Sequence, residues 1–172
     1  MTQGTARLGA LEQHDEAAAD VIRGLLDLAP RGLSAAYVEP TAEFAQTVRA
    51  VSGSAGVAVR PEGRNLRYAA MAALGLALVE EDVQRTTLAG RTASEVVSLA
   101  DQRALTSDDP GAVALIAWAE AEINGVFRGD LFDRLLDWLT SGAPLPTVDV
   151  SWMLTAAGVA AGLGETKQVV DL

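Results

Sequence analysis

The stretch Arg64-Asn65-Leu66-Arg67-Tyr68, followed by an apolar run that ends at Leu78-Val79, decides the fold of this chain. From Tyr68 the run contains about 12 consecutive apolar or Gly residues, which is too few to span a bilayer and suits a buried helix. Ala and Leu, both strong helix formers, dominate it. Because such a helix has no polar face, we expect other elements to cover it on all sides.

The composition restricts the class of protein. The chain has 172 residues, of which 49% are hydrophobic and 21% are charged, as expected for one globular domain with a real core. Its formal net charge of -10 argues against a nucleic-acid or anionic-membrane surface, since both need a basic footprint. Without Cys there is no disulfide, thiolate nucleophile or Cys-ligated zinc. Residues 1–10 lack the apolar core of a signal peptide, so we expect a cytoplasmic protein, and we expect neither a cofactor nor a metal.

Local signals divide the chain into three parts. We expect a loose leader at residues 1–13, a single helical-hairpin domain at residues 14–164 and a frayed tail at residues 165–172. Within the domain, Asp15 is an N-cap for a first helix with a one-sided apolar stripe. Pro30 is expected to end that helix.

Residues 33–63 fit two interpretations. Phe44, Val48 and Val51 have a helical spacing, which favours a helix. The same region also alternates as two strands do, with Ser, Gly and Ala residues between them, which favours a β-hairpin. We favour a small hairpin near residues 44–60.

All-apolar helices alternate with amphipathic ones in the rest of the chain. Residues 112–119 and 150–163 are two more all-apolar segments, and the three starts are spaced by roughly 40 to 45 residues, the length of a helical-hairpin repeat. A capping box at Thr92 and Glu95 begins an amphipathic helix between them. The alternation predicts an all-α fold of helical hairpins in two layers, with the apolar helices inside.

Three strings resemble the inner helices of α/α-toroid proteins: Pro61-Glu62-Gly63-Arg64-Asn65-Leu66-Arg67-Tyr68-Ala69-Ala70-Met71, Gly111-Ala112-Val113-Ala114-Leu115-Ile116-Ala117-Trp118 and Val150-Ser151-Trp152-Met153-Leu154-Thr155-Ala156. That superfamily includes terpenoid cyclases, protein prenyltransferases, lanthionine cyclases and six-hairpin glycosidases, and the chain resembles uncharacterised bacterial members in particular. The resemblance implies part of an α/α toroid.

The chain departs from the toroid pattern in ways that bear on activity. A closed ring in this superfamily usually has five to seven hairpins, and here about two and a half are expected after the N-terminal part. Zinc-dependent members need Cys and His ligands, whereas this chain has His14 as its one His and no Cys. The Asp-x-Asp-Asp and Asp-Asp-x-x-Asp motifs of terpenoid enzymes are also missing from the sequence.

The resemblance places candidate site residues at the starts of the inner helices, which line the mouth of a toroid's funnel and favour anionic ligands. The candidate catalytic residues are Asp108, Asp109 and Asp149; the candidate ligand-binding residues are Asn65, Arg67, Tyr68, Ser151 and Trp152. Carboxylates beside an Arg and aromatic rings suit acid/base work on a glycoside. The same residues also fit structural roles, as N-caps, as an ion pair with Arg67 and as core aromatics.

Two functions follow from these observations. The first is a non-catalytic binding or scaffold module, which the missing catalytic motifs favour. The alternative is a carbohydrate- or isoprenoid-active toroid enzyme, or half of one, that uses the carboxylates to act on a small-molecule ligand. Because a partial ring leaves the flank of an apolar helix open, we expect a homo-oligomer or a partner protein that completes the ring, and no nucleic acid or membrane.

Overall fold

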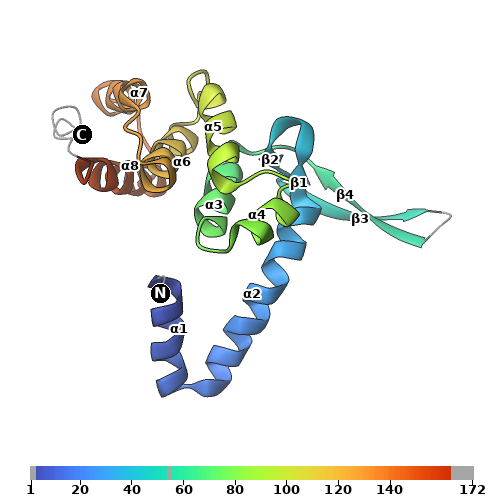
Figure 1. The fold of residues 1–172 in the computed structure, drawn as a ribbon. Coiled ribbons are helices and arrows are strands. Elements are labelled where there is room, and N and C mark those ends of the chain that lie inside the picture. Colours follow the sequence, from blue (N-terminus) through green and yellow to red (C-terminus); the bar gives the residue numbers. More distant parts are fainter. Residues whose placement is uncertain (1–2, 54–55, 164–172) are drawn as a thin grey trace.

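The computed structural model describes residues 3–53 and 56–163, which form a mainly α-helical chain with two small antiparallel sheets of two strands each (Figure 1). The predicted tail at residues 165–172 lies outside the described residues. In chain order the elements are α1 (Gln3–His14), α2 (Glu16–Ala36), β1 (Tyr37–Val38), the 3-10 turn η1 (Glu39–Thr41), β2 (Glu43–Phe44), β3 (Thr47–Gly53), β4 (Gly56–Glu62), α3 (Leu66–Leu76), α4 (Glu81–Thr87), α5 (Ala93–Ala104), α6 (Pro110–Ala119), the π-helical turn η2 (Glu120–Asn124), α7 (Gly129–Thr140) and α8 (Thr147–Ala161). The all-α class with a small hairpin near residues 44–60 is therefore confirmed.

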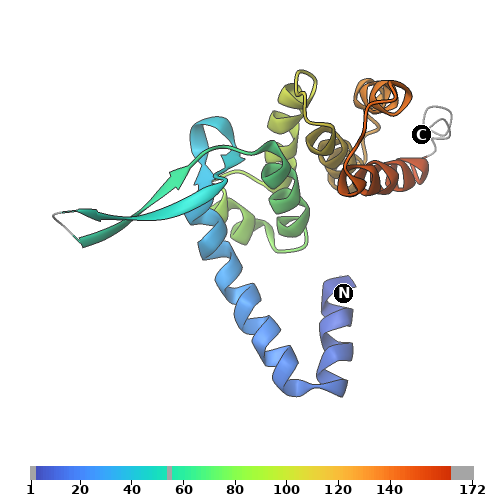
Figure 2. The ribbon, with the colours of Figure 1, turned by 180° about the vertical axis from the view of Figure 1, so that it is seen from behind.

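The three all-apolar segments are neighbouring helices. Helix α6 lies in the middle and packs against α3 on one side and α8 on the other. The amphipathic helices form the second layer, with α5 against α3 and α6, and α7 against α6 (Figures 1 and 2). The predicted capping box begins α5, since the Thr92 side chain accepts from the Glu95 backbone and Glu95 accepts from the Thr92 backbone.

The inner helices differ in how well they are covered. Every residue of α6 from Gly111 to Ala117 is buried, as the sequence predicts. Helices α3 and α8 are buried on one face only, and Met71 and Leu154 stand on their open faces, Leu154 with 74% of its surface exposed. The expectation that all three helices are covered on every side is therefore wrong for α3 and α8. They are the edges of the layer: α8 packs on α6 and η2, while α3 meets only the short strand β2 beyond α5 and α6.

The N-terminal part also differs from expectation. Helix α2 passes through Pro30 and does not end there, because its apolar stripe continues to Leu33 and Ala36, which pack against the main core. Residues 3–13 are not a loose leader either, since α1 packs along α2, where Ala19 is fully buried. Helix α1 has no one-sided apolar pattern of its own. Its packing against α2, and not its own sequence pattern, therefore accounts for its being a helix.

The hairpin of β3 and β4 projects from the body as a long two-stranded ribbon (Figures 1 and 2). Its register pairs Thr47 with Glu62 at the base and Gly53 with Gly56 near the tip. Each residue of β4 from Gly56 to Pro61 is exposed. The other sheet, β1 with β2, is short and lies at the base of the ribbon, where Phe44 enters the core.

Candidate functional site

The starts of the three inner helices meet at one place. Asn65 is the N-cap of α3, and its side chain accepts a hydrogen bond of 2.9 Å from the backbone N–H of Arg67. Asp109 is the N-cap of α6, where it accepts from the backbone N–H of Ala112 at 3.2 Å and Pro110 occupies the first turn. Asp149 lies in the first turn of α8. Short polar side chains at helix starts are favoured because they satisfy free backbone N–H groups, as Asn65 and Asp109 do here. Asp149 is not the N-cap of α8, and no side chain caps that helix.

The guanidinium of Arg67 joins these starts. Its Nε donates to Asp109 Oδ2 at 2.7 Å, and its Nη1 donates to Asp149 Oδ1 at 2.8 Å. Its Nη2 contacts both carboxylates, Asp149 Oδ2 at 3.1 Å and Asp109 Oδ1 in a short ion pair. The guanidinium carbon also lies 5.2 Å from the ring centre of Trp152 on α8, a cation–π distance. Arg67 therefore binds two carboxylates and one aromatic ring at once.

Burial and charge fix the ionisation of this cluster. The Asp149 side chain is only 1% exposed, and a carboxylate so deeply buried is costly unless it is paired, as it is here by Arg67. Partial burial alone would raise the pKa of Asp109, but hydrogen bonds from Arg67 and from the backbone of Ala112 and Gly111 outweigh it and lower that pKa. The bond to Asp109 raises the pKa of Arg67, against the effect of burial, and Asp149 adds to the rise. Arg67 and Asp109 are thus held in their charged forms.

Gly111 gives the cluster its room, a role that was not predicted from the sequence. A Cβ built on Gly111 would lie 2.6 Å from the Arg67 guanidinium carbon and closer still to Asp149 Oδ1. Real Cβ atoms do not approach other heavy atoms so closely, so any other residue would push the ion pair aside. The available signal was a Gly at the second position of a helix, directly after Pro110, where no turn requires one.

The third candidate carboxylate lies elsewhere. Asp108 is exposed and lines a separate pocket of about 200 Å³ with Arg134, Asp137 and Trp138. The structure therefore brings Asp109 and Asp149 together and leaves Asp108 apart from them.

Of the other candidate residues, some belong to the Arg67 cluster and others lie outside it. Trp152 and Asn65 belong to the cluster, as described. Ser151 is exposed, and its hydroxyl donates to the backbone carbonyl of Val148 within α8. Tyr68 points to the open side of α3, where it lines a shallow apolar groove.

That groove has a volume of about 370 Å³ and lies between α2, β2 and α3. Leu33 from α2, Phe44 from β2 and Met71 from α3 contribute its walls, with almost no polar surface. Apolar surface of this kind, left open beside the edge of a helix layer, is typical of a docking surface.

The arrangement limits the chemistry that Asp109 and Asp149 can perform. A general acid needs a pKa near the working pH, whereas the Asp109 pKa is lowered by its bonds. Both oxygens of each carboxylate already accept hydrogen bonds from Arg67. The cluster therefore ties the helix starts together, with Arg67 as a partner of every carboxylate oxygen.

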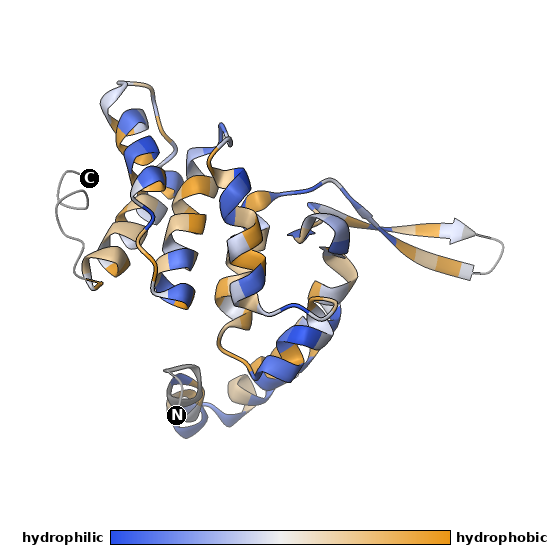
Figure 3. Cartoon of the chain, turned by 45° about the horizontal axis from the view of Figure 1, so that its top comes forward, coloured by the Kyte–Doolittle hydropathy of each residue, from blue (hydrophilic) through white to orange (hydrophobic). Residues whose placement is uncertain are grey.

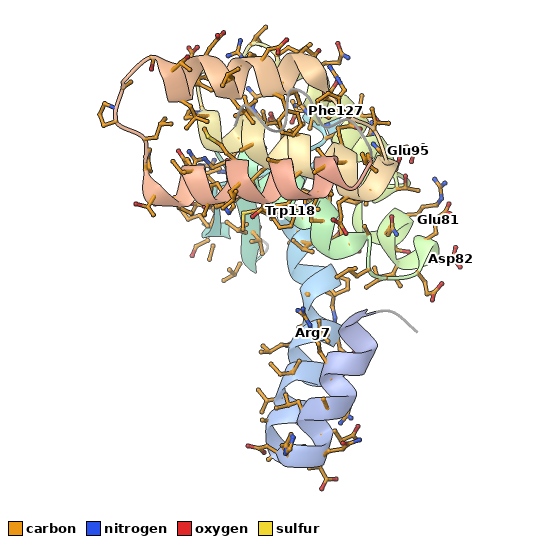
Figure 4. The ribbon with its side chains drawn as sticks, turned by 90° about the vertical axis from the view of Figure 1, so that its left-hand side faces the viewer. Arg7, Glu81, Asp82, Glu95, Trp118 and Phe127 are labelled. Carbon is orange, nitrogen blue, oxygen red and sulfur yellow. The ribbon has the colours of Figure 1, made fainter. Side chains whose placement is uncertain are left out.

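Other charged groups lie both inside the fold and on its surface, since Glu43, Asp101 and Glu120 are buried. Glu81, Asp82 and Glu95 project from one edge of the body (Figure 4), where Arg85 bonds Glu81 at 2.6 Å. Within residues 3–53 and 56–163, no group of three His, Cys, Asp or Glu side chains is placed to hold a metal ion.

Of the helices in the described ranges, none combines the length and the apolar character that crossing a membrane requires. Comparisons of the chain with protein-family models, with curated proteins and with solved structures give no match. The geometry of the helix starts and the exposed surfaces are thus what bear on function.

Proposed function

We propose that the chain is a helical binding or scaffold module without catalytic chemistry, which associates with itself or with a partner chain. In this role the helix layer resembles part of an α/α toroid whose missing neighbours are supplied by another chain. The carboxylates at the helix starts then stabilise the layer.

One observation carries the proposal: Arg67 occupies both Asp109 and Asp149. An enzyme that used these carboxylates would need at least one of them free to exchange a proton or to attack a substrate. Gly111 leaves room for the guanidinium on one side, and the Trp152 ring lies 5.2 Å from the guanidinium carbon. In this proposal Arg67 and its two carboxylates have a structural role, which is to link the starts of the three helices.

The open edges of the layer support association. Met71 on α3 and Leu154 on α8 are exposed although they belong to helices without a polar face. Val150 is exposed on α8 as well, one turn before Leu154. Rows of exposed aliphatic side chains on the outer faces of a helix layer favour a further helix in contact with them.

Light scattering tests the proposal directly. We expect a mass above the 17.9 kDa of one chain at micromolar concentration, or a complex with a product of a neighbouring gene. Leu154→Asp should raise the dissociation constant of that association at least about tenfold, because it buries an unpaired charge in the contact. Thr155→Asp, at the exposed position next to it, is the matched control and should leave the mass unchanged. A wild-type chain that stays monomeric, alone and with those gene products, would overturn the proposal.

The alternative is a carbohydrate- or isoprenoid-active enzyme, or half of one, and one observation favours it. Asp108 is in no ion pair with another described residue, and it shares its pocket with Asp137 and the ring of Trp138. Two carboxylates beside an aromatic ring suit a sugar. Under this alternative Asp108→Asn would abolish glycoside hydrolysis, whereas Asp149→Asn would change stability alone.

A further inference from the structure

A cleft of about 380 Å³ lies at the ends of α3 and α6 that are far from the Arg67 cluster. Its walls come from four elements: the end of α3, the start of α4, the start of α5 and the π-helical turn η2, which follows α6. Small-molecule sites have volumes of about 300–1,000 Å³, so this cleft has room for a small ligand. The Arg67 cluster occupies the opposite ends of the same helices, and a ligand in the cleft would not contact it.

The lining of the cleft combines aliphatic surface with carboxylates. Leu74 and Leu78 from the end of α3 and Ile123 from η2 provide aliphatic side chains, whereas Glu81 and Glu122 provide the acidic groups. Among the described residues that line the cleft, none is Lys, Arg or His. A ligand that matches both kinds of surface has an apolar body and a positively charged head.

The two carboxylates differ in whether a cation already neutralises them. Arg85 donates to Glu81 Oε1 from Nε at 2.9 Å and from Nη2 at 2.6 Å, so Glu81 is paired. The carboxylate of Glu122 has neither a hydrogen bond nor an ion pair with any described residue. Glu122 is therefore the carboxylate of the cleft that can take one further cation.

The surroundings of the cleft are negative as well. Residues 74–95 carry four carboxylates and two Arg. Figure 3 shows the chain changing from apolar residues at the end of α3, in orange, to hydrophilic residues at the start of α4, in blue. The end of α3 adds the partial negative charge of a helix C-terminus. These charges together attract a cation to the cleft.

The start of α5 also borders the cleft, but it does not make an anion site. Three of the four backbone N–H groups from Thr92 to Glu95 are already bonded: Thr92 N–H to Glu95 Oε2 at 2.7 Å, Ala93 N–H to Gln84 Oε1 at 2.9 Å and Glu95 N–H to Thr92 Oγ1 at 3.2 Å. A helix start binds an anion through free N–H groups, and here the Glu95 carboxylate would repel one.

The residues of the cleft also select the kind of cation. Within the described part of the chain no aromatic ring lines the cleft, so the cation–π cage that suits a quaternary ammonium is missing. A primary ammonium instead offers three N–H donors to a carboxylate. An aliphatic chain attached to it would lie against Leu74 and Ile123.

We infer that this cleft binds a primary ammonium group on an aliphatic chain, which pairs with Glu122 and packs its chain against Leu74 and Ile123. A free alkylamine and the lysine side chain of another protein both present this chemistry. The inference goes beyond the proposed function, because a single chain would bind this cation whether or not it associates.

Titration with n-pentylamine tests the site, with the amide NMR shifts of Ala93 and Ile123 as the readout. Pentylammonium should bind at least about tenfold more tightly than methylammonium, because its methylene groups are buried in the cleft. It should bind at least about threefold more tightly than 1-pentanol, which has the same chain without the charge. Blocked lysine (Nα-acetyl-lysine methylamide) forms the second arm, and the tighter of the two amines identifies the source of the ligand.

A pair of matched variants tests the role of Glu122. Glu122→Gln should raise the dissociation constant of pentylammonium about fivefold. Glu16→Gln removes one exposed carboxylate from α2 and should leave the constant within about twofold. Both side chains are exposed, so circular dichroism should show an unchanged fold.

Three results would overturn the inference: equal effects of the two variants, methylammonium or pentanol binding as tightly as pentylammonium, or shifts that saturate with neither amine. None of them would change the mass by which the proposed function is tested, so the two can fail separately.

Discussion

Arg67 and Asp149 lie 82 residues apart in the chain, and Arg67 Nη1 donates a hydrogen bond of 2.8 Å to Asp149 Oδ1. The bond joins α3 to α8, the two edges of the inner layer, although α6 lies between them. It passes over Gly111, whose missing side chain allows the approach. With its second ion pair, to Asp109 at the start of α6, Arg67 thus joins all three helices.

Removing the buried carboxylate should destabilise the fold strongly. Asp149→Ala leaves Arg67 without one of its partners, and breaking a buried pair costs about 3–5 kcal/mol. Because Asp109 still binds Arg67, we expect a loss of about 3 kcal/mol in the free energy of unfolding, measured with urea. Glu122→Gln, at an exposed site, should change it by less than about 0.5 kcal/mol. Equal effects of the two substitutions would contradict a structural role for Asp149.

Filling the space at Gly111 should also destabilise. Gly111→Ala places a methyl group against the Arg67 guanidinium, and overpacking of this kind costs about 1–3 kcal/mol. Gly158→Ala in α8 is the matched control, because its Cβ would meet nothing within 4 Å. That change should stabilise by about 0.5–1 kcal/mol, since Ala is the better helix former. The prediction fails if both substitutions shift the urea midpoint in the same direction.

The contribution of Asp109 should depend on pH. Its pKa is lowered in the folded chain, so the stability that it contributes is complete above the unfolded Asp pKa of about 3.9 and is lost as pH falls through the lower folded value. The penalty of Asp109→Asn, measured by urea unfolding near pH 7, should therefore shrink between about pH 4 and pH 2. A penalty that is constant or grows on acidification would show that the Arg67 pair does not stabilise the fold.

Pro30 should weaken α2 locally. A proline inside a helix removes one backbone hydrogen bond and costs up to about 3 kcal/mol relative to Ala. Pro30→Ala should slow amide hydrogen exchange in α1 and α2, while exchange in α6 stays unchanged. Exchange that becomes faster in α2 would mean that the proline is needed at that position.

The sequence predicted the inner helices well because their signals are local and redundant. Three local signals predict the helix α6: the N-cap at Asp109, the Pro110 that follows it, and an unbroken apolar run. The structure confirms this helix. Pro30 shows the opposite case, since its local signal to stop was outweighed by packing of Leu33 against the body.

The candidate site was predictable in part. Polar residues at helix starts were visible in the sequence, and so was an ion pair of Arg67 with an acidic partner. That one guanidinium takes both Asp109 and Asp149 depends on how closely three helices approach, which no local pattern records. Asp108 and Asp109 are adjacent in the chain yet face different surroundings, because a helix start turns successive side chains apart.

The strand β4 is joined to the Arg67 cluster by a very short connection. After Glu62, the backbone N–H of Asn65 donates to the Phe44 carbonyl at 3.1 Å, and Arg67 follows two residues later. Only residues 63–66 therefore separate the end of β4 from Arg67, whose guanidinium lies over the ring of Trp152. In a variant without Trp118 and Trp138, the fluorescence of the Trp152 indole would therefore report a movement of Arg67.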